Sequence, residues 1–189
     1  MIKKILIISV LTLTGSVYAT NAANQDQKGV IQEGPELGQT ATAEEVAALS
    51  INIFPDGRGL PEGSGSVTQG ATIYQSKCIA CHGAGALGGS AEPLAGAEMG
   101  LTSEWPEKTI GTLWPHATTL FDFTRRSMPM TAPGSLSNDE TYALTAYLLY
   151  LNNIVAEDLV LNKETIMQVK MPNADGFINI YEQKKQKNK

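Results

Sequence analysis

The chain has 189 residues, of which 42% are hydrophobic and 17% are charged, with 18 glycines, 9 prolines and 2 cysteines. This composition is that of a globular protein, and it excludes a disordered, collagen-like or disulfide-dense chain. The formal net charge of −5 argues against nucleic acid as a partner, because a nucleic-acid binder normally neutralises phosphates with a basic surface.

Residues 1–19 have the pattern of a secretory signal peptide. Lys3 and Lys4 precede an apolar run over residues 5–13, and small side chains stand before a cleavage point after Ala19. The run is shorter than the ~20 residues that a membrane-spanning helix requires. We therefore expect export to the bacterial periplasm and a mature chain without a membrane span. An uncleaved anchor is the alternative interpretation.

Residues 20–66 are predicted to form a flexible lead-in, a short helix and an extended strap. The lead-in is polar and aperiodic up to residue 40. Thr42 and Glu45 form a capping box ahead of an apolar stretch, which predicts the start of a helix. Residues 51–66 are rich in proline and glycine, which is typical of an extended segment with turns.

Residues 67–155 are predicted to form one helical domain. Apolar residues recur there at helical spacing, and there is little alternation of the β type. The clearest helix follows a second capping box at Ser137 and Glu140. We expect helices over Thr68–Lys77, Pro106–Leu113 and Pro115–Arg126, and a fourth from Ser137 to Leu151. Residues 156–189 are predicted to be a C-terminal extension, with a short helix over Lys163–Val169 and a basic tail.

The sequence Cys78-Ile-Ala-Cys81-His82 is a C-x-x-C-H motif, the attachment pattern of haem c. Two cysteines three residues apart on a helical turn can form thioethers to the two vinyl groups of one porphyrin. The next residue, His82, is then directed at the iron from one face of the ring. One covalent haem c therefore accounts for both cysteines of the chain.

Three other interpretations of the motif stay open at this point. A thioredoxin-like C-x-x-C motif would stand in a βαβ context, whereas the surroundings here have helical patterns and a glycine-rich loop. A zinc site requires four good ligands, and the chain offers two cysteines and two histidines. A structural disulfide would close only a very short loop.

The sixth ligand of the iron decides between electron transfer and catalysis. A methionine sulfur opposite His82 raises the reduction potential and closes the iron to substrates. Met128 is the favoured candidate, because it follows a predicted helix and precedes Pro129, which stiffens the loop. Met130 and Met171 are the alternatives.

Several other side chains have both a functional and a structural interpretation. His116, the second histidine, could ligate the iron, but a histidine at a helix start more often has a capping or surface role. Arg125 and Arg126 could pair with haem propionates or lie on a solvated helix end. Met99 and Met167 are expected to fill gaps in the core.

Matches longer than the haem motif point to one protein family. The run from Trp114 to Asp122 (WPHATTLFD) and the segment Lys170-Met-Pro-Asn173 accompany a haem motif that Gly70 and Tyr74 precede. On these residues the chain resembles the class I cytochromes c. More narrowly, it resembles the monohaem cytochrome c subunit of bacterial sulfite dehydrogenase, a group similar to the cytochrome subunit of sulfur dehydrogenase in thiosulfate oxidation.

The resemblance implies an all-α class I cytochrome c fold, with helices wrapped round one covalently attached haem and an extended N-terminal strap. It implies covalent links at Cys78 and Cys81, and axial iron ligands at His82 and Met128.

The resemblance also implies a periplasmic electron carrier that is not itself an enzyme. Its donor would be the catalytic subunit of a molybdenum sulfite dehydrogenase, which gives up electrons one at a time. Its acceptor would be a downstream cytochrome or oxidase of the respiratory chain. The alternative is a small peroxidase-like haem protein with an open sixth coordination site, in which His116 and Arg125 would stand near the iron.

Overall fold

The computed structural model describes residues 38–178, so the predicted signal peptide, most of the lead-in and the whole basic tail lie outside the described residues. From Ala41 onward the described chain forms one compact unit. It begins with α1 (Ala43–Leu49), which starts at the predicted capping box. The Thr42 hydroxyl accepts the N–H of Glu45, and the Glu45 carboxylate accepts the N–H of Thr42. No residue of α1 is buried.

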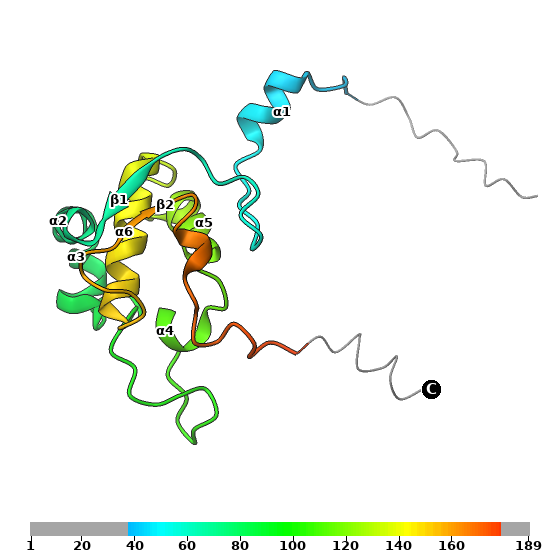
Figure 1. Cartoon of the computed structure of the whole chain (residues 1–189). Helices are drawn as coiled ribbons and strands as arrows, with labels where there is room; N and C mark the ends of the chain where they lie inside the picture. The colour runs from blue at the N-terminus through cyan, green and yellow to red at the C-terminus, as the bar shows by residue number, and fades with distance from the viewer. Residues whose placement is uncertain (1–37, 179–189) are drawn as a thin grey trace, which may run out of the picture. The chain divides into compact units, whose positions relative to one another are not determined.

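Helices form the framework, as predicted, and the sheet of the described residues has only two short strands. The three long helices are α2 (Val67–Lys77), α5 (Ala117–Ser127) and α6 (Asn138–Leu151). Helix α6 packs against both α2 and α5 and is buried along most of its length (Figure 1). The short elements between them are α3 (Ile79–His82), the 3-10 helix η1 (Ala84–Ala86) and α4 (Ile110–Leu113). Within residues 38–178, no helix has the length and apolar character needed to cross a bilayer.

The crossing of α2 and α6 depends on a residue without a side chain. A Cβ atom at Gly70 would lie 2.0 Å from the carbonyl oxygen of Ala143. This close approach brings Tyr74 of α2 against Tyr147 of α6, with ring centroids 5.4 Å apart. The contact with α6 therefore fixes the direction of α2, and with it the position of Cys78 at the end of α2.

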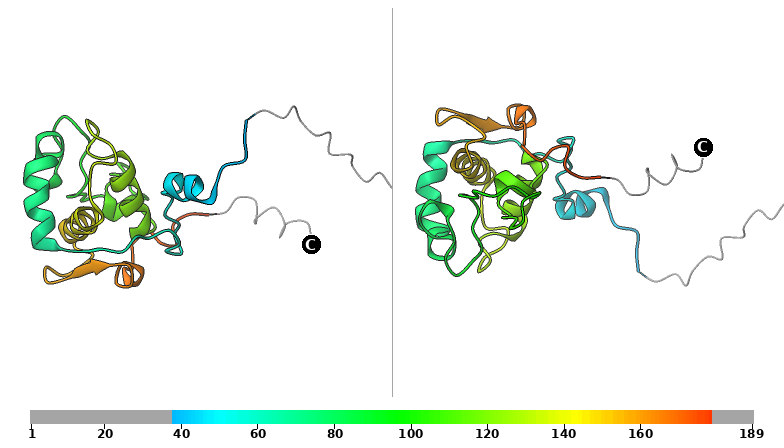
Figure 2. Two further views of the ribbon diagram at one scale, coloured as in Figure 1. Left: turned by 90° about the horizontal axis from the view of Figure 1, so that it is seen from above. Right: turned by 90° about the horizontal axis from the view of Figure 1, so that it is seen from below.

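The strap and the C-terminal extension pair with each other. Strand β1 (Ser64–Ser66) runs antiparallel to β2 (Val160–Asn162), with Gly65 opposite Leu161. Leu161 is fully buried, and the first residue of the 3-10 helix η2 (Ile166–Gln168) also lies in the core. Figure 2 shows the two strands on one side of α6. The extension is thus packed into the same unit as the helices.

The strap is also tied to α5 by a charged pair. Asp122 and Arg126 stand one turn apart on α5 and form an ion pair of 2.7 Å. The Asp122 carboxylate accepts the N–H of Ile53 at 3.1 Å, and the Arg126 guanidinium donates to the Asn52 side chain at 3.1 Å. These bonds hold the strap on α5, the helix whose C-cap residue is Met128.

The helix predicted over Pro106–Leu113 is shorter in the structure and begins only at Ile110. Glu107, which the prediction placed in the first turn of this helix, instead closes the preceding loop. The Glu107 carboxylate accepts the N–H groups of Glu98 and Met99 at 2.8 and 2.7 Å. The Glu107 side chain therefore closes the loop eight and nine residues before it, and the first helical turn that we expected does not form.

The helix predicted over Lys163–Val169 is reduced to the single 3-10 turn of η2. The Asn162 side-chain oxygen accepts the N–H groups of Glu164 and Thr165 at 3.0 and 2.8 Å. An asparagine that bonds the backbone two residues ahead makes a local turn, which competes with a regular helix start.

An ion pair between α2 and α6 gives the fold a small pH dependence. Lys77 Nζ lies 2.6 Å from Glu140 Oε1, and this hydrogen bond lowers the pKa of Glu140 from its ordinary value of 4.5. A carboxyl group with a lowered folded-state pKa stabilises the fold above its unfolded-state pKa. That contribution is lost as the pH falls through the folded-state pKa.

We expect Glu140→Gln, which can still cap Ser137, to lower the free energy of unfolding at neutral pH by less than about 1 kcal/mol, as for other surface pairs. At a pH well below the pKa of Glu140, the variant and the natural protein should be equally stable, because both side chains are then neutral. Urea unfolding at the two pH values measures the difference. A difference of the same size at both would contradict the assignment to the ion pair.

Candidate haem site

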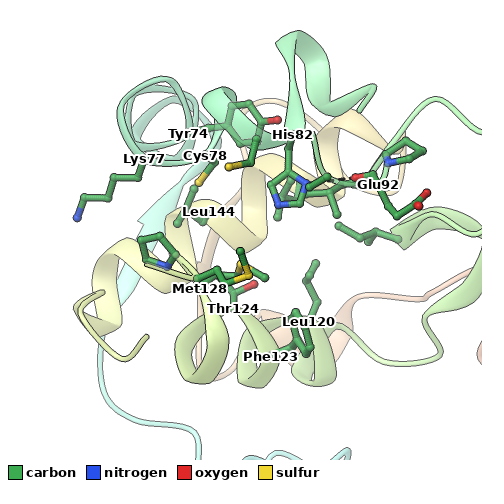
Figure 3. A pocket seen from close by; sticks show the side chains of 18 of the residues that line it. Tyr74, Lys77, Cys78, His82, Glu92, Leu120, Phe123, Thr124, Met128 and Leu144 are labelled. Carbon is green, nitrogen blue, oxygen red and sulfur yellow. Dashed lines mark hydrogen bonds between the residues drawn. The ribbon is translucent and has the colours of Figure 1, made fainter. Parts of the chain in front are cut away.

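A cavity of about 450 Å³ opens between the helices. Its walls come from α2, α3, the segment 90–94, α4, α5 with the loop after it, and α6. Many of its lining side chains are apolar, among them Leu94, Ile110, Leu120, Leu144 and Leu148. Figure 3 shows that His82 and Met128 reach into this space from opposite walls.

The C-x-x-C-H motif forms the corner between α2 and α3. Cys78 stands between the two helices, Cys81 and His82 belong to the single turn of α3, and all three line the cavity. The Tyr74 hydroxyl donates to the Gly83 carbonyl at 2.8 Å, which closes the corner. Burial raises the pKa of Tyr74 to about 12, so this donor keeps its proton at neutral pH. Burial also raises the pKa of the Cys78 thiol.

The imidazole of His82 has one nitrogen held and one nitrogen free. Its Nδ1 lies 3.2 Å from the backbone carbonyl oxygen of Glu92. A carbonyl only accepts, so Nδ1 carries the proton and donates it, which leaves the Nε2 lone pair available to a metal. Hydrogen bonds of this kind orient metal-binding imidazoles. His82 can therefore present Nε2 to an iron in the cavity.

Met128 enters the cavity from the end of α5. It is the C-cap residue of that helix, and its N–H donates to the Thr124 carbonyl at 3.1 Å. Met130 also lines the cavity, but its side chain is 78% exposed. Met171 is only 5% exposed and lies in the core, outside the cavity wall. Of the three methionine candidates, only Met128 is both partly buried and in the wall.

The other candidates from the sequence lie away from the cavity. His116 is the N-cap residue of α5 and is not part of the wall. Arg126 bonds its ion-pair partner and the strap, and neither Arg125 nor Arg126 lines the cavity. Met99 and Met167 are exposed, so the expectation that they fill the core is wrong.

Sequence reasoning assigns no role to three groups in the wall. The carbonyl of Glu92 is a backbone group, so side-chain patterns do not indicate it. Pro93 was a usable signal, because a proline restricts the preceding residue to extended backbone and so helps to fix that carbonyl. Lys108 and Lys77, the latter paired with Glu140, also line the cavity, and as single lysines they have no distinctive pattern.

The residues around the cavity fit haem c. Two thiols, an imidazole nitrogen and a thioether sulfur meet at one apolar space, which is the donor set for covalent attachment and two axial bonds. A zinc site is not supported, since residues 38–178 contain no group of three or more His, Cys, Asp or Glu side chains placed to hold a metal ion. The motif lies between two helices rather than in a βαβ unit, and Cys78 and Cys81 are not joined by a disulfide.

Comparisons with known proteins agree with this fold and donor set. The family described as cytochrome c matches residues 67–152. The crystal structure of the sulfane dehydrogenase SoxCD from Paracoccus pantotrophus is similar with a TM-score of 0.73 and 43% identity, over 80% of this chain and 75% of that chain. Thiosulfate dehydrogenase from Allochromatium vinosum is 25% identical over 121 residues, which are 63% of this chain. The chain spans 40% of the length of that relative.

Proposed function

The chain belongs to the cytochrome c family, with the class I fold and covalently bound haem c, and from this premise we propose that it carries single electrons in the oxidation of reduced sulfur compounds. We propose further that Cys78, Cys81, His82 and Met128 hold the haem. The observation that carries this proposal is the meeting of these four side chains at one apolar cavity, with His82 and Met128 on opposite walls (Figure 3).

Each residue of the site has a distinct role in this proposal. Bound haem c supplies one iron, which takes up and releases a single electron. The Cys78 and Cys81 thiols fix the ring at the corner of α2 and α3. The Glu92 carbonyl holds the Nδ1 proton of His82, so Nε2 would be the atom that binds the iron. The Met128 sulfur would bind it from the opposite wall, which would favour the reduced state and leave no position for a substrate.

The apolar wall of the cavity also favours the reduced state of the iron. Leu120, Leu144 and Leu148 line the space with apolar side chains. A charge is less favourable in apolar surroundings than in water. Oxidised iron carries the additional positive charge, so this wall should also favour the reduced state. We therefore expect this protein to have a high reduction potential, so that it accepts electrons readily and is a weak reductant.

The proposed electron donor is a separate enzyme in the periplasm. From the sequence resemblance we propose the catalytic subunit of a molybdenum sulfite dehydrogenase, with a downstream cytochrome or oxidase as acceptor. The relatives named above are a thiosulfate dehydrogenase and a sulfane dehydrogenase. They support a donor that acts on reduced sulfur, and a substrate other than sulfite is the alternative within this class. The chemistry on that substrate belongs to the partner, and this chain receives the electrons.

Absorption spectra of the mature holoprotein test the ligand set. We expect a low-spin ferric spectrum with a charge-transfer band from methionine to iron, and a reduced protein that does not take up carbon monoxide. A reduced, five-coordinate haem that binds carbon monoxide at once would contradict the proposal and support the peroxidase-like alternative. His116, which this alternative would place near the iron, is not among the residues that line the cavity.

Stopped-flow mixing identifies the donor. Sulfite is added to the oxidised holoprotein together with a molybdenum sulfite dehydrogenase, and the absorbance of reduced haem is followed. We expect one haem to be reduced for each electron that sulfite provides. A mixture without the dehydrogenase is the control, and a parallel mixture contains thiosulfate and a thiosulfate dehydrogenase. Reduction only in the thiosulfate mixture would contradict the sulfite assignment and leave the role as an electron carrier intact.

A further inference from the structure

Asn152 lies where three segments of the cavity wall meet. Its side-chain nitrogen donates to the carbonyls of Leu94 at 3.0 Å and Leu148 at 2.8 Å. Its side-chain oxygen accepts the N–H of Gly111 at 3.0 Å. Both ends of the amide are therefore engaged with backbone groups. One side chain at the C-cap of α6 links that helix to the segment 90–94 and to α4.

The segment that Asn152 holds is also the one that orients His82. The Leu94 carbonyl accepts the Asn152 amide, and two residues earlier the Glu92 carbonyl faces His82 Nδ1 at 3.2 Å. Pro93 stands between them, and its ring fixes one of the two backbone torsions of that residue. With that torsion fixed, part of a shift at Leu94 reaches the Glu92 carbonyl.

Gly111 is fitted to the same contact. A Cβ atom there would lie 2.8 Å from the side-chain oxygen of Asn152 and 3.2 Å from its Cβ atom. Alanine is the better helix former by roughly 1 kcal/mol. A harmful effect of Gly111→Ala would therefore come from the contact with Asn152 and not from helix propensity.

We propose that Asn152 is a positioning residue for the haem ligand: it holds the backbone carbonyl that orients the imidazole of His82. This inference rests on the proposed ligation of the iron by His82. An imidazole that donates a strong hydrogen bond from Nδ1 is the more basic ligand, and it stabilises the ferric state. Loss of Asn152 weakens that bond, so the reduction potential rises.

The test compares the natural holoprotein with Asn152→Leu, in which the side chain keeps the same number and branching of heavy atoms and loses its hydrogen-bonding groups. We expect the Nδ1–H of His82 to exchange with solvent at least tenfold faster in the variant, as measured by nitrogen-resolved NMR of the ferrous protein. We also expect the equilibrium constant for reduction to rise between threefold and tenfold, where tenfold corresponds to about 59 mV for one electron. Gly111→Ala should move both quantities in the same direction.

Asn138→Ala is the matched control, because the Asn138 side chain donates to the Glu62 carbonyl at 3.1 Å at the other end of α6. This variant should be less stable than the natural protein. Its exchange rate and its equilibrium constant for reduction should both stay within a factor of two of the natural values. An exchange rate and a potential in Asn152→Leu equal to those of the natural protein, or of this control, would overturn the inference.

The natural protein supplies a further measurement in case the variants do not mature. The side-chain amide protons of Asn152 should exchange slowly, and rapid exchange would overturn the inference even without a variant. Failure of the proposed function would look different. The natural protein would then lack the spectrum of a haem with histidine and methionine ligands, whatever Asn152 does.

Discussion

Replacing Met128 by alanine should open the iron of this protein to external ligands. The Met128 sulfur enters the cavity opposite His82, and alanine leaves only a methyl group in its place. We expect loss of the methionine–iron charge-transfer band and rapid uptake of carbon monoxide by the reduced protein. The reduction potential should fall by on the order of 0.1 V, a part of the roughly 0.8 V range that axial ligands cover. Absorption spectra and a potentiometric titration measure these changes.

Met130→Ala is the control for this experiment. Met130 is the second methionine that lines the cavity, but its high exposure makes it a poor candidate for a buried iron ligand. The variant should keep the charge-transfer band, the potential and the resistance to carbon monoxide. If Met130→Ala loses the band and Met128→Ala keeps it, the sixth ligand is Met130, and the electron-carrier proposal stands with a different ligand.

One face of the haem site could be predicted from the sequence because its geometry is local. Cys78, Cys81 and His82 lie within one helical turn, so their mutual arrangement follows from the spacing alone. The helix starts at Thr42 and Ser137 were predicted for the same reason, since a capping box satisfies backbone groups only three residues away.

The remainder of the site depends on contacts between distant segments. Glu107 looked like part of a helix, but its carboxylate closes a loop, and no local pattern indicates that use. Asn152 directly follows the predicted helix, and its three backbone partners lie in segments up to 58 residues away in the sequence. The Glu92 carbonyl is set by these contacts. Met128 could be nominated from its proline neighbour, but only the packing of α5 places it opposite His82.

Replacing Gly70 by alanine should strongly destabilise the fold. The added Cβ would lie 2.0 Å from the carbonyl oxygen and 2.6 Å from the carbonyl carbon of Ala143. These are backbone atoms, so no change of side-chain rotamer relieves the overlap, and α2 and α6 must move apart. Inserting volume into a packed core costs about 1–3 kcal/mol and occasionally more. We expect a loss of about 3 kcal/mol or more, a large part of the roughly 5–15 kcal/mol that stabilises a typical domain.

The sign of this effect separates packing from helix propensity. Alanine favours a helix over glycine by roughly 1 kcal/mol, so propensity alone predicts that Gly70→Ala stabilises α2. Thr72→Ala is the control, because Thr72 is exposed on the same helix and a surface change there should stay within about 0.5 kcal/mol. Urea unfolding of the holoproteins, followed by circular dichroism, measures both. If Gly70→Ala proved as stable as the control, the close crossing would not govern stability, and the direction in which α2 delivers Cys78 to the haem would need another cause.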